Sequence, residues 1–233
     1  MARAAAKSRS FSSLRNVAAF SALAALLASP LDLAAQPAPA AQSRDAASQE
    51  LLNSERIEQR YGSYGVEVLA SDAATRVSNL YSEHAGQRIC RTFAVVRYAP
   101  SIDARVASEH AAILAGGSIG ATFTARGWMV VKRHRYAGEI ATPPRLAALM
   151  GGIGSARLAV HVYALDVVKD GVRLEYATIA EVHHPDYLGL PDLQEVYGAE
   201  APLPTEPDAT ARAMLALVAE KAGASPAIGS RQP

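Results

Sequence analysis

The chain has 233 residues, of which half are hydrophobic, and its 23 Lys and Arg residues nearly balance its 22 Asp and Glu residues. This length suffices for one well-buried core and is short for two. A surface that binds nucleic acid needs a clustered excess of positive charge, which this sequence lacks, so nucleic acid is excluded as the main partner. The single cysteine, Cys90, excludes an intramolecular disulfide and any zinc or iron–sulfur site built from several thiolates.

The N-terminus has the order of features that is typical of a secretory signal peptide. Basic residues from Arg3 to Arg15 precede an apolar run from Val17 to Ala28. This run is shorter than the roughly 20 residues of a spanning helix, which disfavours an uncleaved membrane anchor. We therefore expect residues 1–35 to be a signal peptide, and the mature protein to be periplasmic or secreted with no membrane partner. Residues 36–49 are expected to form a flexible Ala/Pro/Gln-rich leader, and residues 50–233 a single domain with a C-terminal helical extension.

Hydrophobic periodicity and turn signals predict alternating strands and helices after the leader. In chain order they are a helix over Leu51–Arg60, strands over Val66–Ala70, Thr75–Ser82 and Arg88–Tyr98, a helix over Ala104–Leu114, a strand over Trp128–Tyr136, a helix over Pro144–Met150, strands over Ala156–Val168 and Val172–His184, and a helix over Ala209–Ala222. Asp170-Gly171 between the last two strands is a strong hairpin signal. The order predicts an α+β domain whose helices pack on one side of an antiparallel β-sheet.

The same periodicities predict the core. Strand alternation and helix period place five apolar side chains inside, and the Lys169-Asp170-Gly171 turn outside. The five are Val95, Val160, Val162, Ile179 and Leu215.

Two short patterns suggest a catalytic or metal site. Gly116 to Gly120 fits the G-x-S-x-G motif of serine hydrolases, with Ser118 as nucleophile, but it lies between a predicted helix and a predicted strand. A nucleophile elbow instead joins a strand to the helix that follows. His183 and His184 are neighbours on a predicted strand, so their side chains point to opposite faces and cannot bind one metal ion together. An esterase is therefore a minor hypothesis, and no metal site is expected.

Two charged residues lie on otherwise apolar strand faces. Arg91 alternates with Phe93 and Val95 in one predicted strand, and Glu181 shares a face with Ile179 in another. If these faces point inward, both charges are buried, which is costly unless the charges are paired or belong to a functional site. Three interpretations remain open on this basis: an Arg91–Glu181 salt bridge, an exposed sheet face, or a ligand site.

Several short motifs between Thr75 and Leu190, about half of the chain, resemble those of the chorismate pyruvate-lyase family. They are an Arg91-Thr92 step in a strand, an Ile119-Gly120 turn after a helix, and Glu181-Val182-His183-His184-Pro185 at the end of the last strand. The resemblance implies a chorismate lyase-like fold. It also implies a cofactor-free and metal-free elimination that converts chorismate to 4-hydroxybenzoate and pyruvate.

The resemblance also assigns roles to residues. Arg91 would pair with a substrate carboxylate, the backbone at Ile119 and Gly120 would close over the same group, and Glu181 would contact the ring hydroxyl, with Glu181 and Arg91 as the catalytic pair. A guanidinium suits such an anchor because its fork matches a carboxylate. We therefore expect Arg91, Glu181 and the Ser118–Gly120 turn to line one closed cavity. The implied partner is a small carboxylic acid, and the alternative function is that of an exported, non-enzymatic binding protein with the same pocket.

Overall fold

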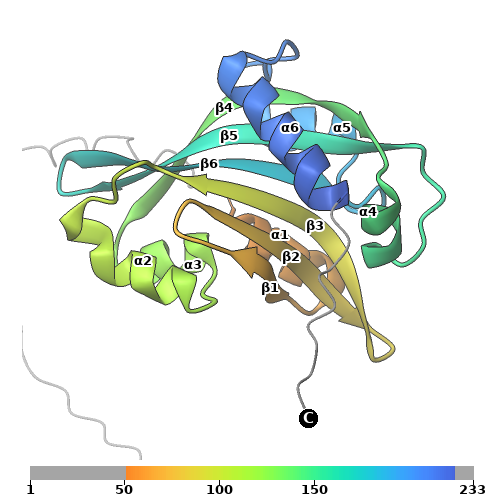
Figure 1. Cartoon of the computed structure of the whole chain (residues 1–233), viewed down its shortest axis with the longest axis horizontal. Helices are drawn as coiled ribbons and strands as arrows, with labels where there is room; N and C mark the ends of the chain where they lie inside the picture. Colours follow the sequence, from red (N-terminus) through yellow and green to blue (C-terminus); the bar gives the residue numbers. More distant parts are fainter. Residues whose placement is uncertain (1–50, 224–233) are drawn as a thin grey trace, which may run out of the picture. The chain divides into compact units, whose positions relative to one another are not determined.

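The computed structural model describes residues 51–223, which form one sheet with helices packed against it (Figure 1). The expected signal peptide, residues 1–35, and the expected leader, residues 36–49, lie outside the described residues. Among residues 51–223, no helix is long and apolar enough to cross a membrane.

Six antiparallel strands form the sheet, in the order β1-β2-β3-β6-β5-β4. Their bounds are Gly65–Ser71 for β1, Thr75–His84 for β2, Gln87–Tyr98 for β3, Met129–Ala141 for β4, Arg157–Lys169 for β5 and Val172–His183 for β6. Strands β1–β3 and β4–β6 are two meanders, and the pairing of β3 with β6 joins them in the middle of the sheet. The α+β class with an antiparallel sheet is thus confirmed.

The predicted β5–β6 hairpin is also confirmed. Asp170 and Gly171 form its turn, with positive φ values of 51° and 76°. A two-residue hairpin turn needs this left-handed backbone, which Gly adopts freely and Asp tolerates.

The helices cover both faces of the sheet, rather than the one face that was expected. They are α1 (Asn53–Tyr61), the 3-10 turn η1 (Ala104–Val106), α2 (Ala107–Leu114), α3 (Ile119–Ala125), α4 (Pro144–Leu149), α5 (Leu190–Tyr197) and α6 (Ala209–Gly223). In Figure 1, α6 lies across one face of the sheet, while α1, α2 and α3 lie on the other. The physical reason is that the central strands are apolar on both sides, so each face needs a cover.

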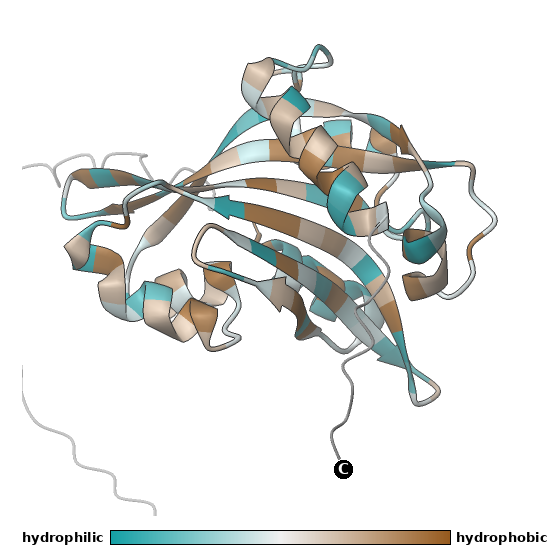
Figure 2. Cartoon of the chain, in the orientation of Figure 1, coloured by the Kyte–Doolittle hydropathy of each residue, from teal (hydrophilic) through white to brown (hydrophobic). Residues whose placement is uncertain are grey.

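The face under α6 is the larger apolar core. Val95, Val160 and Val162 are fully buried there against Met214 and Val218 of α6. Figure 2 shows hydrophobic residues along the middle of these strands and hydrophilic residues at the hairpin tips. The buried positions predicted for Val95, Val160, Val162 and Ile179 are confirmed, whereas Leu215 is only partly buried.

Helix α3 is a further difference from the prediction, which placed only a glycine turn between the helix at 104–114 and the next strand. Gly116 ends α2 with a φ of 108°, a conformation that glycine adopts without strain. A Cβ on Gly117 would lie 2.9 Å from the carbonyl oxygen of Ala112, so this close turn also requires glycine. The chain then re-enters a helix at Ile119, with Ser118 at the N-cap position.

Candidate functional site

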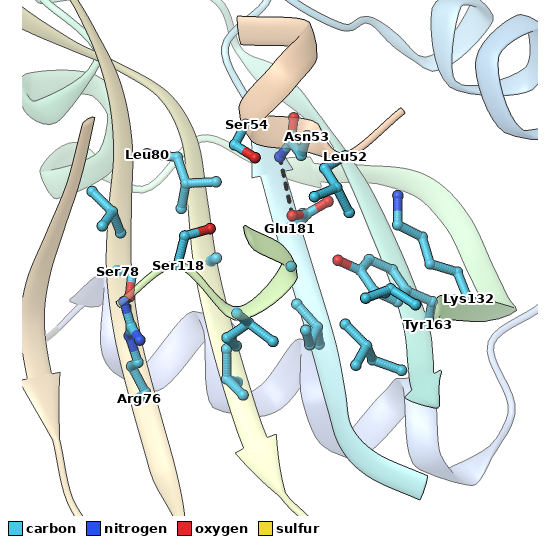
Figure 3. Close-up of a pocket in the computed structure, with 18 of the residues that line it drawn as sticks. Leu52, Asn53, Ser54, Arg76, Ser78, Leu80, Ser118, Lys132, Tyr163 and Glu181 are labelled. Atoms are coloured by element: carbon cyan, nitrogen blue, oxygen red, sulfur yellow. Dashed lines mark hydrogen bonds between the residues drawn. The ribbon is translucent and has the colours of Figure 1, made fainter. Parts of the chain in front are cut away.

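A cavity, part of which is open to solvent, lies on the sheet face that α1 and α3 cover. Figure 3 shows its side chains converging from α1, the sheet and the start of α3. The lining residues are Leu52, Asn53, Ser54, Tyr64, Val66, Arg76, Ser78, Leu80, Ala94, Val96, Ser118, Ile119, Gly120, Val130, Lys132, Tyr163, Leu165, Ile179 and Glu181.

Arg76, on β2, is the buried cation of this cavity, with only 2% of its surface exposed. Its Nε donates to Ser78 Oγ at 2.8 Å, and its Nη1 donates to the carbonyl oxygens of Ile113 (2.8 Å) and Gly117 (2.7 Å). No ion pair within residues 51–223 involves Arg76. Neutral oxygens hold the guanidinium in place and leave its charge uncompensated, which suits the binding of an anion.

Glu181, on β6, is the buried acid of the same cavity, with 4% of its surface exposed. Asn53 Nδ2 donates to Glu181 Oε1 at 3.0 Å (Figure 3). It also donates to Thr92 Oγ1 at 3.2 Å. Asn53 Oδ1 in turn accepts a 2.6 Å hydrogen bond from the hydroxyl of Tyr187. Helix α1 therefore fixes the orientation of the Glu181 carboxylate through one amide side chain.

Sheet register sets the spacing of these two charges. Ser78 pairs with Ala94, and Ala94 pairs with Glu181, so Ser78 and Glu181 lie level with each other two strands apart, or about 10 Å between backbones. The Arg76 guanidinium leans onto Ser78 and thus toward this level. The cavity is therefore lined by a buried cation from β2 and a buried acid from β6.

Arg91 does not line this cavity, contrary to the expectation that it would line one cavity with Glu181. A β-bulge, in which Leu80 pairs with Thr92 and Tyr81 with Cys90, leaves Arg91 as the extra residue of β3. Arg91 lies at the end of α1, whereas the start of that helix lines the cavity. Its Nε donates to Ser82 at 2.9 Å, and its guanidinium lies 3.8 Å from the ring centroid of Tyr61. Arg91 thus packs against the C-terminal end of α1, while Phe93 and Val95 face α6.

Ser118, Ile119 and Gly120 do line the cavity together with Glu181. A Cβ on Gly120 would lie 2.8 Å from Leu52 Cδ2, so glycine allows α3 to approach the start of α1 closely. Tyr64 also lines the cavity, and burial is the main cause that raises the pKa of its hydroxyl. Because α2 precedes the motif, Ser118 does not occupy the strand-to-helix elbow of a serine hydrolase.

Lys132, on β4, is a second cation of the cavity. Its Nζ lies 4.4 Å from the ring centroid of Tyr197 and 5.3 Å from that of Tyr163. Such placement over aromatic faces stabilises an ammonium group away from bulk water.

Two buried histidines lie beside Glu181 on the same sheet face. His161 pairs with Glu181 across β5 and β6, and His183 Nδ1 contacts Thr92 Oγ1 at 3.1 Å. Burial, reinforced by the nearby charge of Lys132, lowers the pKa of His161 well below its usual value and that of His183 to about 3. Both imidazoles are therefore neutral at neutral pH.

His183 and His184 point to opposite sides, as strand geometry predicts. His184 contacts the carbonyl oxygen of Met150 at 3.2 Å and accepts from the backbone of Asp186 at 3.0 Å, whereas His183 faces Thr92. Within residues 51–223, no group of three or more His, Cys, Asp or Glu side chains is arranged to hold a metal ion.

Arg76, Asn53 and Lys132 are among the polar cavity residues that were not identified from the sequence. Strand alternation could have indicated two of them, because Arg76, Ser78 and Leu80 share one face of their predicted strand and Lys132 shares a face with Val130. No known protein family and no curated protein matches the sequence.

Proposed function

We propose that the cavity binds chorismate or a closely related cyclic carboxylic acid and eliminates pyruvate from it to give 4-hydroxybenzoate, without a cofactor. This proposal rests on one observation: two buried side chains of opposite charge, Arg76 and Glu181, line the same cavity. Arg76 has no carboxylate within ion-pair distance among residues 51–223, and a hydrogen bond from Asn53 orients the Glu181 carboxylate.

Arg76 takes the anchoring role that the resemblance gave to Arg91. Ser78, Ile113 and Gly117 take the hydrogens of its Nε and Nη1, so its Nη2 donates to the ring carboxylate. Ile119 and Gly120, which line the cavity nearby, lie against the same group. Glu181 accepts a hydrogen bond from the ring hydroxyl. Because neutral oxygens already hold the guanidinium, little reorganisation is needed when the substrate binds.

The elimination depends more on how the substrate is oriented in the cavity than on reactive side chains. Elimination breaks the C–O bond to the enolpyruvyl group and the C–H bond at the carbon that bears the hydroxyl. The ring becomes aromatic, and the released enolpyruvate takes up a proton to become pyruvate. Aromatisation drives the reaction, so holding the ring at both ends is the contribution that this protein makes.

The alternative is binding without turnover. The N-terminal pattern of residues 1–35 favours it, since chorismate is made in the cytoplasm and the chain is expected to be exported. Such a protein would use Arg76 and Glu181 to capture a small aromatic acid from its surroundings.

Incubation of the purified protein with chorismate tests both functions. Formation of 4-hydroxybenzoate and pyruvate in equal amounts, lost in Arg76→Gln, supports the lyase. Binding of 4-hydroxybenzoate in a calorimeter without turnover of chorismate supports the binding protein. Absence of both turnover and binding would show that the cavity serves another ligand class.

A further inference from the structure

We infer that His161 and His134 form a proton relay that connects Glu181, the buried acid of the cavity, with the edge of the sheet at β4. This inference rests on the proposed function and deepens it. The elimination removes a proton from the carbon that bears the hydroxyl, and Glu181 contacts that hydroxyl in the proposed complex. Only 4% of Glu181 is exposed, so a proton that it takes up while the ligand fills the cavity needs a path to water.

His161 lies directly beside the acid. It pairs with Glu181 across β5 and β6, so the two side chains project from the same sheet face with their Cβ atoms about 5 Å apart. His161 is fully buried, and its Nδ1 has no hydrogen-bond partner among residues 51–223. A buried nitrogen without a partner is uncommon in a folded protein. Catalytic hydrogen bonds are often long without ligand and shorten in the complex, so this nitrogen is the acceptor for a proton from Glu181.

The other ring nitrogen of His161 leads toward the surface. His161 Nε2 and His134 Nδ1 are 2.9 Å apart, which is hydrogen-bond distance between two imidazoles. His134 belongs to β4, the edge strand of the sheet, and is only partly buried. Glu181, His161 and His134 therefore stand in series from the cavity to the sheet edge.

The protonation state of His161 suits the transfer. Burial, reinforced by the charge of Lys132, lowers its pKa, so the ring is neutral at neutral pH. A neutral imidazole accepts a proton at one nitrogen and donates one from the other, so it can pass a proton on without holding a charge. The ring is surrounded by titratable side chains from β4, β5, β6 and α5, namely Lys132, His134, Tyr163, Glu181, His183 and Tyr197.

Each turnover then moves one proton outward. Glu181 takes the proton from the hydroxyl-bearing carbon, the C–H electron pair joins the aromatic ring, and the electron pair of the broken C–O bond leaves with the enolpyruvate oxygen. Glu181 gives its proton to His161 Nδ1, while His161 Nε2 gives one to His134 Nδ1 and His134 gives one to water. The enolpyruvate takes up one proton from water, so the overall reaction neither releases nor uses protons.

The first test needs no turnover. In protein labelled with ¹⁵N-histidine, NMR measures how fast the ring N–H of His161 exchanges with water, in the wild type and in His134→Phe. Phenylalanine keeps a ring against Tyr197 but cannot carry a proton. Because His161 is fully buried, we expect its exchange to run through His134 and to slow at least about tenfold in this variant. A histidine with only a structural role would exchange at the same rate or faster after its neighbour is replaced.

The second test follows the turnover of chorismate. His134→Phe and His161→Phe should lower kcat at least about tenfold and leave KM within about twofold, because the relay moves protons without binding the substrate. Imidazole added to the solution should restore much of the kcat lost in His134→Ala. His110→Phe is the control and should match the wild type, because His110 is also partly buried and contacts one side chain, Tyr176, but lies on α2.

The outcomes separate the relay from the proposed function. Unchanged or faster exchange in His134→Phe overturns the relay, and so does a wild-type kcat in that variant, while the proposed function stands. If the wild type does not turn chorismate over, the proposed function fails and the exchange measurement decides the relay. Thermal midpoints establish that each variant is folded, and His134→Ala replaces His134→Phe in the exchange measurement if the phenylalanine variant is not.

Discussion

Asn53, the first residue of α1, donates a 3.0 Å hydrogen bond to Glu181, which lies 128 residues further along the chain. The same amide group accepts from Tyr187 and donates to Thr92. The Asn53 side chain therefore links helix α1 to Glu181, the buried acid of the cavity.

We predict that Asn53→Ala weakens recognition of the ligand hydroxyl. The substitution removes the donor that orients Glu181, so the preference for 4-hydroxybenzoate over benzoate should fall by about tenfold, with a loss of about 1–3 kcal/mol in the free energy of unfolding. Calorimetric Kd values for the two acids measure the preference. Asn79→Ala is the control, because Asn79 is equally buried but contacts Glu67. An unchanged preference would mean that Glu181 does not contact the hydroxyl.

A second prediction separates the two buried arginines. Arg76→Gln should weaken the binding of 4-hydroxybenzoate at least 30-fold in Kd, equivalent to about 2 kcal/mol, because it removes the charge that faces the cavity. Arg91→Ala should leave the Kd within about twofold and lower the free energy of unfolding by about 1–2 kcal/mol, through loss of its contacts with Ser82 and Tyr61. The reverse pattern would restore Arg91 as the anchor.

The difference between Arg76 and Arg91 shows what the sequence could and could not predict. Alternation places Arg91 with Phe93, and this fails because a one-residue bulge, which no residue type announces, turns Arg91 toward α1. Glu181 was predicted correctly as a buried acid because β6 is regular at that point. In a regular strand, the two-residue alternation of the sequence predicts which face of the sheet each side chain takes. A bulge depends on how the strand pairs with a second strand, which the alternation does not show.

The helices, too, could be predicted from the sequence only in part. Asp208 caps α6 through a 2.7 Å bond from the backbone of Ala211, and this local signal predicted the helix correctly. Helix α3 was missed because Gly116 and Gly117 read as an end to helical structure. In the folded protein these glycines join two helices that turn back on each other.

A third prediction concerns the closure of the cavity. Gly120→Ala should weaken the binding of 4-hydroxybenzoate several-fold. The added methyl group would lie 2.8 Å from Leu52 and displace that side chain within the cavity lining. Leu52→Ala in the same protein should restore part of the affinity by making room. Gly154→Ala, where nothing lies within 4 Å of the added group, is the control and should bind as the wild type does. Unchanged affinity in Gly120→Ala would show that the two segments separate when the ligand binds.

The fourth prediction concerns acid stability. Burial lowers the pKa of His183 to about 3, from an ordinary value near 6.5 in the unfolded chain. The unfolded state therefore binds one more proton between these values, so His183 makes the folded state less stable as pH falls from about 6.5 toward 3. The expected contribution is about 1.4 kcal/mol per pH unit.

Urea unfolding between pH 7.5 and 4.5 measures this slope. His183→Gln should be less steep than the wild type by about that amount, while His84→Gln, at an exposed position near the β2–β3 turn, should keep the wild-type slope. Equal slopes in all three proteins would mean that His183 titrates normally in the folded state.

The joining of two meanders by the β3–β6 pair also has a kinetic consequence. Arg76 belongs to the first meander and Glu181 to the second, so neither half of the chain contains a complete site. Each meander can form from contacts that are local in the sequence, but the β3–β6 pair closes a loop that includes α2, α3 and all of β4 and β5. Such long-range closure is the slow part of folding. During refolding, the chain should therefore recover most of its strand content before it recovers any affinity for its ligand.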